Sequence, residues 1–179
     1  GSIDVIFLDK TGTITSGMPE VVSSDLDVQS LSEVLALENA SIHPLAEAVK
    51  KYCALKGISP SPGVSEIEEI AGEGISGMCG DDKIFIGRPA DAAKYSPNMS
   101  GGETVIEFRR NDTPAGVISI ADRIKPDSHE AVVRLKDSGI TPVMLTGDSA
   151  VTARAVAAAT GIENVISGVR PEQKLFEIQ

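Results

Sequence analysis

The segment Ile3-Asp4-Val5-Ile6-Phe7-Leu8-Asp9-Lys10-Thr11-Gly12-Thr13-Ile14-Thr15 joins an apolar run to a polar turn. The run from Ile3 to Leu8 is typical of a buried parallel strand. Asp9 then stands at the C-terminal end of that strand, where open α/β sheets build their sites because backbone N–H groups of the turn favour an anion such as phosphate. The pattern predicts Asp9 as a nucleophile. An Asp that merely ends a strand before an ordinary Thr/Gly turn is the alternative.

Further along the chain, strands and helices are predicted to alternate. We expect a helix over 127–138, a buried strand over 141–145, a helix over 150–160 and a short strand over 164–167. This alternation favours an α/β fold with a doubly wound parallel sheet. The segment 22–120 differs, because two amphipathic helices precede five short strands, at 31–42, 44–56, 66–70, 75–79, 83–87, 104–109 and 115–121. The sequence thus predicts an α+β domain, 22–120, inserted into a split domain formed by 1–21 and 121–179.

The composition limits the class of protein. With 179 residues, 41% of them hydrophobic and 23% charged, the chain is expected to be an ordinary soluble globular protein. Its net charge of -10 disfavours nucleic acid or an anionic membrane surface as a partner. No apolar run of about 18 residues and no secretory leader is found, so we expect no membrane span and no secretion. Cys53 and Cys79 lack metal or disulfide spacing, and we expect reduced thiols in a cytoplasmic setting.

Five motifs, scattered along the chain, carry a resemblance to a known family. The heptapeptide that starts at Asp9 resembles the phosphorylation motif of the P-type ATPases. Thr146-Gly147-Asp148 resembles their second phosphate-site motif, and Pro171-Glu172-Gln173-Lys174 resembles their P-x-x-K motif. Ser41-Ile42-His43-Pro44-Leu45 and Gly72-Glu73-Gly74-Ile75-Ser76-Gly77 resemble the S-x-H-P and G-x-G motifs of the heavy-metal-transporting (CPx) branch. The resemblance covers nearly the whole chain and implies a haloacid-dehalogenase-like phosphorylation domain with an inserted nucleotide-binding domain.

For phosphoryl transfer, the resemblance implies that Asp9 accepts the γ-phosphoryl group of ATP, with Mg²⁺ held by Asp9 and the backbone carbonyl of Thr11. Thr11 and Lys174 are the other implied catalytic residues. The implied phosphate contacts come from two segments, with Lys10, Thr11, Gly12 and Thr13 in the first and Thr146, Gly147 and Asp148 in the second. Thr11 stands where related phosphatases carry a second Asp as general acid and base. Because a hydroxyl group cannot activate water comparably, an aspartyl phosphate is expected to persist, as a pump requires.

For nucleotide binding, Glu38 and His43 keep the spacing of the pair that contacts adenine in the heavy-metal branch. Gly72 and Gly74 fit its glycine loop, where missing side chains let backbone approach the nucleotide. Arg88 stands where that branch often has Asn, so it departs from the pattern, and we include it among the nucleotide-binding residues. A structural histidine at a helix start is the alternative for His43.

The sequence is therefore interpreted as the cytoplasmic ATP-binding and phosphorylation part of a pump for copper, zinc or a similar ion. Its implied partners are the transmembrane and actuator domains of the same polypeptide, and no nucleic acid. The family's G-D-G-x-N-D-x motif, which supplies an Mg²⁺-binding Asp, has no counterpart here, so we expect a fragment that is poorly active alone. One alternative is a free-standing haloacid-dehalogenase-like phosphatase with a cap domain. The other is a nucleotide-binding regulatory module without catalysis, which the presence of Asp9 and Lys174 disfavours.

Overall fold

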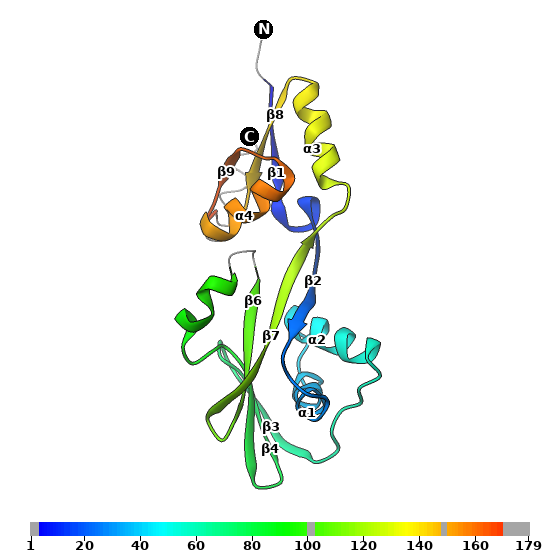
Figure 1. Ribbon diagram of the computed structural model, residues 1–179, viewed down its shortest axis with the longest axis vertical. Helices are drawn as coiled ribbons and strands as arrows, with labels where there is room; N and C mark the ends of the chain where they lie inside the picture. Colours follow the sequence, from blue (N-terminus) through cyan, green and yellow to red (C-terminus); the bar gives the residue numbers. More distant parts are fainter. Residues whose placement is uncertain (1–3, 100–102, 148–149, 170–179) are drawn as a thin grey trace. The chain divides into compact units, whose positions relative to one another are not determined.

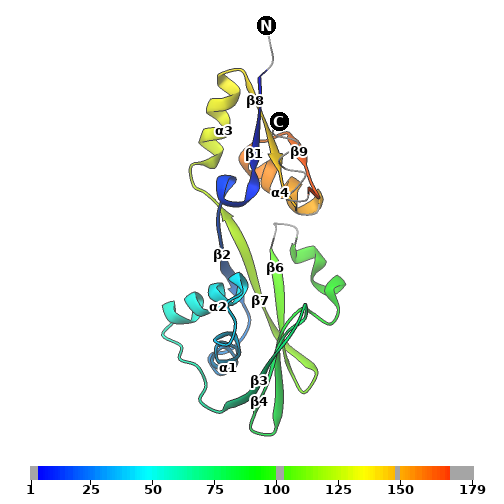
Figure 2. The same ribbon diagram turned by 180° about the vertical axis from the view of Figure 1, so that it is seen from behind.

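The computed structural model describes residues 4–99, 103–147 and 150–169. The chain divides into two compact units. Unit 1 comprises the described residues of 1–18, 98–103 and 122–179, and unit 2 comprises 19–97 and 104–121. The chain passes from unit 1 to unit 2 within strand β2 (Thr15–Ser24) and returns within strand β7 (Thr113–Ile124), as Figure 1 and Figure 2 show.

Unit 1 is built on a parallel sheet of strands in the order β1-β8-β9. These strands are β1 (Asp4–Asp9), β8 (Ile140–Leu145) and β9 (Asn164–Ile166). Helix α3 (Ser128–Asp137) precedes β8, and helix α4 (Ala150–Thr160) joins β8 to β9. The two helices pack on each other and on these strands. Their apolar side chains meet those of the sheet in a core formed by Ile14, Val132, Met144, Ala153, Val156, Ala157 and Ile162.

Unit 2 contains most of a sheet of six strands in the order β2-β7-β6-β5-β4-β3. The strands β3 (Val64–Ile70), β4 (Gly74–Cys79), β5 (Asp82–Gly87), β6 (Thr104–Arg110) and β7 pair antiparallel. A short 3₁₀ segment, η2 (Ala92–Met99), lies between β5 and β6 in the chain. The two-residue connection between β6 and β7 has positive φ at Asn111 (51°) and Asp112 (65°), as a type I′ hairpin turn requires.

Two helices cover one face of the antiparallel sheet. Helix α1 (Val28–Glu38) and helix α2 (Pro44–Leu55) pack against each other, and α1 contacts β3, β4 and β5. Alternate residues of the strands, such as Ile84 and Ile86, join Val34 and Leu37 of α1 in one apolar core. Asp27 caps the N-terminus of helix α1, and its carboxylate accepts a hydrogen bond from the backbone N–H of Ser30 at 2.7 Å.

The parallel sheet with its helices and the antiparallel α+β part are both found, and two-residue connections at Gly80-Asp81 and Asn111-Asp112 join antiparallel neighbours. Two expectations were wrong, and two elements were not predicted. Helix α1 was predicted over 31–42, but it starts three residues earlier, at Val28, and ends four residues earlier, at Glu38. It starts earlier because Asp27 caps it. Strand β2 and the segment η2 were not predicted, since Gly17 and Pro19 obscure the strand pattern. The first half of β1 is not buried: Val5 is 49% exposed, because β1 is an edge strand of the described sheet.

Among the described residues, no helix is both long and apolar enough to cross a membrane.

Candidate functional site

Asp9 is the last residue of β1, and the chain after it turns sharply. The Asp9 carboxylate accepts a hydrogen bond from the backbone N–H of Thr11 at 3.3 Å, so the side chain is held over the turn. Gly12 has φ +80°, a conformation that residues with a side chain rarely adopt. Thr11, Gly12 and Thr13 are exposed, whereas Lys10 is only 8% exposed. The turn therefore presents the Asp9 carboxylate together with exposed backbone and hydroxyl groups, a suitable setting for an anionic substrate.

The end of this turn is fixed by a residue that lies far away in the sequence. The buried Thr15 hydroxyl lies within hydrogen-bond distance of Asp122 Oδ2 and of the carbonyl oxygen of Lys10, the latter at 3.1 Å. Asp122 also accepts hydrogen bonds from the Ser16 hydroxyl at 3.3 Å and from the backbone N–H of Gly17 at 3.0 Å. Asp122 thus holds both ends of the turn through Thr15, and the sequence patterns predicted this role for neither residue.

The second phosphate-site motif starts beside the first. Strands β1 and β8 are parallel neighbours with Asp9 opposite Leu145, so Thr146 and Gly147 begin at the same edge of the sheet where β1 ends. Thr146 is buried, and its backbone donates to the carbonyl of Ile166 at 3.1 Å and accepts from the N–H of Val169 at 3.0 Å. Two motifs that are more than 130 residues apart in the sequence therefore meet at one sheet edge. The predicted residues Asp148 and Lys174 lie outside the described residues.

The residues at this edge fit magnesium in the type of their ligand atoms. Mg²⁺ prefers hard oxygen ligands and is usually held by one or two carboxylates, substrate phosphate and water. The Asp9 carboxylate and the Thr11 carbonyl are oxygen donors on one short turn, which suits that preference. In residues 4–99, 103–147 and 150–169 no group of three or more His, Cys, Asp or Glu side chains could hold a metal ion.

A second candidate site lies entirely within unit 2. A cleft of about 400 Å³ opens between the α1–α2 connection and the ends of strands β4, β5 and β6. Its walls include all five residues that the sequence predicts for nucleotide binding, Glu38, His43, Gly72, Gly74 and Arg88. Apolar side chains such as Ile75, Ile86 and Ile106 line the rest. A mostly apolar cleft with a few convergent polar groups is the usual form of a small-molecule site.

The connection between α1 and α2 has a fixed conformation. The backbone N–H of His43 donates to the Ser41 hydroxyl at 3.1 Å, and the Lys50 ammonium donates to the carbonyl of Ser41 at 2.7 Å. His43 caps helix α2, because its Nδ1 accepts a hydrogen bond from the backbone N–H of Leu45 at 3.1 Å. Since Nδ1 accepts, the neutral ring carries its proton on Nε2. His43 therefore has a structural role in the cap and a second ring nitrogen that is a hydrogen-bond donor.

Glu38, the last residue of α1, is a buried acid at the cleft. It is 6% exposed, and among the described residues no group donates a hydrogen bond to its carboxyl group. Burial raises the pKa of Glu38 to about 7, the Lys50 ammonium opposes this rise, and the negative charge of Glu69 adds to it. A buried carboxyl group without a hydrogen-bond partner is costly in a folded protein unless a ligand supplies the donor.

The glycines of the cleft are required for different reasons. Gly74 lies opposite Gly87 in the β4–β5 pairing, and a Cβ at Gly74 would lie 2.2 Å from the carbonyl oxygen of Ile86. Gly72 has φ +74° with open space around it. Gly74 thus permits close packing of two strands, whereas Gly72 permits a turn and leaves room at the cleft.

Comparison with known proteins extends these observations. Residues 3–179 match the family described as haloacid dehalogenase-like hydrolase. A copper-exporting P-type ATPase of Staphylococcus haemolyticus is 34% identical over 98% of the chain, and a zinc-transporting ATPase of Bacillus subtilis is 34% identical over all of it. The chain covers 23% and 30% of these two relatives.

Solved structures show the same similarity. The crystal structure of a zinc-transporting PIB-type ATPase in the E2.Pi state has a TM-score of 0.82 and 30% identity over 98% of this chain and 30% of its own. The catalytic domain of the CPx-ATPase CopB-B, studied for conformational changes upon nucleotide binding, has a TM-score of 0.77 and 28% identity over 98% of this chain and 65% of its own.

Proposed function

We propose that this chain, which belongs to the haloacid dehalogenase-like hydrolase family, is the ATP-binding and phosphoryl-accepting part of a heavy-metal-transporting P-type ATPase. Relatives that transport copper and zinc are similar over essentially all of the chain, which supports this branch. The chain spans 23% and 30% of the length of these two relatives, so the rest of the pump is inferred from them. We therefore propose transmembrane and actuator domains in the same polypeptide, a cytoplasmic position for this part, and copper, zinc or a similar ion as cargo.

The two units have separate roles in this proposal. Unit 2, close to the predicted range 22–120, is the nucleotide-binding domain, and unit 1 is the phosphorylation domain that carries Asp9. The observation that carries the proposal is the buried carboxyl group of Glu38, which has no hydrogen-bond donor among the described residues and lines the cleft with His43. A ligand with a hydrogen-bond donor would satisfy it.

Adenine has the required pattern of donors and acceptors. Its exocyclic amino group can donate to Glu38, and its ring nitrogens can accept from the Nε2 proton of His43. Guanine presents a carbonyl acceptor where adenine has the amino group. Above about pH 7, where Glu38 is ionised, its carboxylate would therefore face an acceptor. The apolar walls at Ile75 and Ile86 would cover the faces of the base.

In the proposed reaction, a carboxylate oxygen of Asp9 forms a bond to the γ-phosphorus of ATP. The bond from that phosphorus to the oxygen bridging the β- and γ-phosphates breaks, and ADP leaves. Asp9 and the Thr11 carbonyl would hold Mg²⁺, which neutralises charge on the phosphoryl group during transfer. Backbone N–H groups of the turn and the Thr146 segment would surround the phosphoryl oxygens. Thr11 supplies no carboxylate for activating water, which favours the pump over the phosphatase.

The experiment is a titration of the whole chain with ATP and with GTP at about pH 8, where Glu38 is ionised, measured by calorimetry and by backbone amide NMR shifts. We expect ATP to bind more tightly than GTP and to shift the amides of 41–45 and 71–76. Glu38→Gln should reduce the preference for ATP, because an amide can rotate to donate to guanine.

A matched control is Glu33→Gln, which changes another buried glutamate of α1 that does not line the cleft. It should leave the preference for ATP unchanged. Equal affinity for ATP and GTP in the unmodified chain, or amide shifts that avoid 41–45 and 71–76, would contradict the proposed nucleotide site.

A further inference from the structure

The face of the antiparallel sheet opposite α1 and α2 carries a cluster of polar and aromatic side chains. Ile84 and Ile86 of β5 belong to the apolar core, so Phe85 between them points to the other face. Phe85 pairs across the strands with Arg109 of β6, and Gly87 pairs with Glu107. The cluster therefore lies directly behind the stretch of β5 that leads to Arg88 at the cleft.

Arg109 makes three contacts at once. Its guanidinium carbon lies 4.2 Å from the centroid of the Phe85 ring. Its Nη1 donates to Glu107 Oε1 at 3.1 Å and lies 3.4 Å from the carbonyl oxygen of Arg88, to which it also donates. A planar guanidinium group that stacks on a ring and donates at its edge is fixed in position, which an aliphatic ammonium would not be.

Glu107 anchors this arrangement from inside the protein. Its side chain is 2% exposed, and it also accepts hydrogen bonds from the Tyr95 hydroxyl at 2.7 Å and from the backbone N–H of Ala90 at 3.3 Å. Burial by itself would raise the pKa of Glu107, but the hydrogen bonds from Tyr95, Ala90 and Arg109 outweigh it and lower the pKa below its usual range. Glu107 is thus a buried carboxylate that ties the segment after Arg88 to strand β6.

Phe85 in turn supports the glycines of the cleft. A Cβ placed on Gly74 or on Gly87 would lie 2.7 Å from Cζ of the Phe85 ring, so the backbone at both positions packs directly against the ring. The backbone N–H of Arg88 donates to the carbonyl of Glu73 at 2.8 Å, which joins the same two stretches of chain. Gly74, Gly87 and Arg88 are all wall residues of the cleft.

We propose that Arg109 is a positioning residue for the nucleotide cleft, because it fixes the Phe85 ring beneath the paired glycines and holds the backbone of Arg88 through its carbonyl group. The inference rests on the proposed function, since it assigns Arg109 to the nucleotide site. Without Arg109, the wall formed by Gly74, Gly87 and Arg88 would be less well ordered in the free protein, and ATP binding would have to order it. Ordering one or two such groups weakens binding by about tenfold.

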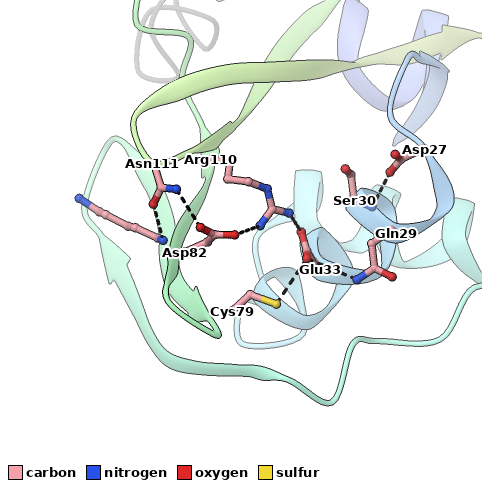
Figure 3. A network of polar contacts seen from close by, with 9 residues as sticks. Asp27, Gln29, Ser30, Glu33, Cys79, Asp82, Arg110 and Asn111 are labelled. Carbon is pink, nitrogen blue, oxygen red and sulfur yellow. Dashed lines mark hydrogen bonds and ion pairs between the residues drawn. The ribbon is translucent and has the colours of Figure 1, made fainter.

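The neighbouring residue provides a matched control. Figure 3 shows Arg110 between Glu33 of α1 and Asp82 of β5, with Cys79 and Gln29 also in contact with Glu33. Arg110, like Arg109, pairs with an almost fully buried glutamate: the Glu33 side chain is 3% exposed. None of the residues in this second network lines the cleft. Arg109→Gln and Arg110→Gln thus each remove the positive partner of a buried carboxylate. Only Arg109 lies behind the cleft.

The experiment measures ATP affinity by calorimetry and thermal stability by circular dichroism for the whole chain and both variants. We expect both variants to melt at lower temperature, and Arg109→Gln alone to weaken ATP binding, by about tenfold. Arg109→Gln should also change the amide NMR signals of Gly72, Gly74 and Arg88 in the absence of ATP. Equal ATP affinity of Arg109→Gln and Arg110→Gln would overturn the inference.

A second variant covers the case in which Arg109→Gln does not fold. Phe85→Leu keeps an apolar side chain but removes the ring from beneath the glycines, and it should also weaken ATP binding relative to Arg110→Gln. Unchanged affinity in Phe85→Leu would overturn the inference. If the unmodified chain does not bind ATP, the proposed function fails instead, so the two failures are distinguishable.

Discussion

The backbone N–H of Leu45 donates a hydrogen bond to Nδ1 of His43 at 3.1 Å, and this contact gives the histidine two separable tasks. Nδ1 caps helix α2, while the Nε2 proton of the neutral ring is available as a donor to a ligand. His43 lines the cleft, so the structural and the binding interpretation of this residue are compatible. Two substitutions separate them.

His43→Asn should keep the cap, because Asn is among the best N-cap residues. Its side chain is shorter, so it should not supply a donor at the position of Nε2. His43→Gln should keep a donor at a similar distance and lose the cap. We therefore expect Asn to weaken ATP binding by about 1 kcal/mol with little change in stability, and Gln to lower the free energy of unfolding by about 1 kcal/mol. Calorimetry and urea unfolding measure the two effects. Equal losses of affinity and stability in both variants would refute the separation.

The raised pKa of Glu38 predicts a dependence of stability on pH. The folded state holds the proton up to about pH 7, whereas an ordinary glutamate releases it near 4.5. Stability from this group is therefore present in full below about pH 4.5 and is lost as the pH rises through 7. Between pH 5 and pH 8 the loss should amount to roughly 2 to 3 kcal/mol. Urea unfolding at both pH values measures it.

Glu38→Gln has no such proton to lose. Its free energy of unfolding should therefore rise relative to that of the unmodified chain as the pH goes from 5 to 8. Lys50 provides a second test, because its positive charge lowers the pKa of Glu38. In Lys50→Met the loss of stability should continue to higher pH. A constant difference between Glu38→Gln and the unmodified chain at all pH values would show that Glu38 does not titrate in this range.

The elements that follow from local sequence rules were predictable. Pro44 and Gly57 mark the ends of α2, and the Asn111-Asp112 pair marks a hairpin, since each acts through its own backbone. The resemblance to heavy-metal P-type ATPases was also predictable from short motifs, and similarity over the full chain confirms it. The cleft gathers Glu38, His43 and three further residues that the spacing of these motifs indicates.

The remainder depends on contacts between distant segments. Asp122 reaches Thr15 across 107 positions, and Arg109 reaches the Arg88 carbonyl across 21. Neither pair has a spacing that a helix or a strand would explain, so no periodic pattern points to it. Strand β2 escaped prediction because its Pro19 is tolerated at the edge of the sheet, where β2 lies. Sequence motifs thus indicate the residues that we propose to contact a ligand more readily than the residues that hold them in place.

The two glycines of the cleft should respond differently to alanine. Gly74→Ala places a Cβ against the Ile86 carbonyl and the Phe85 ring, and it should lower the free energy of unfolding by about 2 kcal/mol or more. Gly72→Ala meets no atom within 4 Å, so only its φ of +74° is unfavourable, at about 1 kcal/mol. Urea unfolding should rank them in this order. The reverse order would contradict the packing at the Gly74–Gly87 pair.

The Thr15 hydroxyl should matter for the stability of unit 1. Thr15→Val keeps the shape but removes the hydroxyl group that lies within hydrogen-bond distance of both Asp122 and the Lys10 carbonyl, so we expect a loss of about 1 to 3 kcal/mol in the free energy of unfolding. Ser16→Ala is the control, because Ser16 is exposed and its contact with Asp122 is long, at 3.3 Å. Its effect should stay within about 0.5 kcal/mol. Equal effects of the two substitutions in urea unfolding would remove Thr15 from its assigned role.

Asp9 should be the residue that receives the phosphoryl group. Because the chain alone is expected to be poorly active, the test uses the full-length pump. Incubation of that protein with γ-labelled ATP and Mg²⁺ should give a protein-bound label that survives acid and is released by hydroxylamine, as an acyl phosphate is. Asp9→Asn should reduce the rate of labelling by at least about a hundredfold, because the amide is a poor nucleophile and loses the charge that helps to hold the metal ion. Asp4→Asn is the matched control, since Asp4 lies at the exposed beginning of the same strand. It should label at the normal rate. Labelling of Asp9→Asn at the rate of Asp4→Asn would show that the phosphoryl acceptor is another residue and that the proposed reaction is wrong.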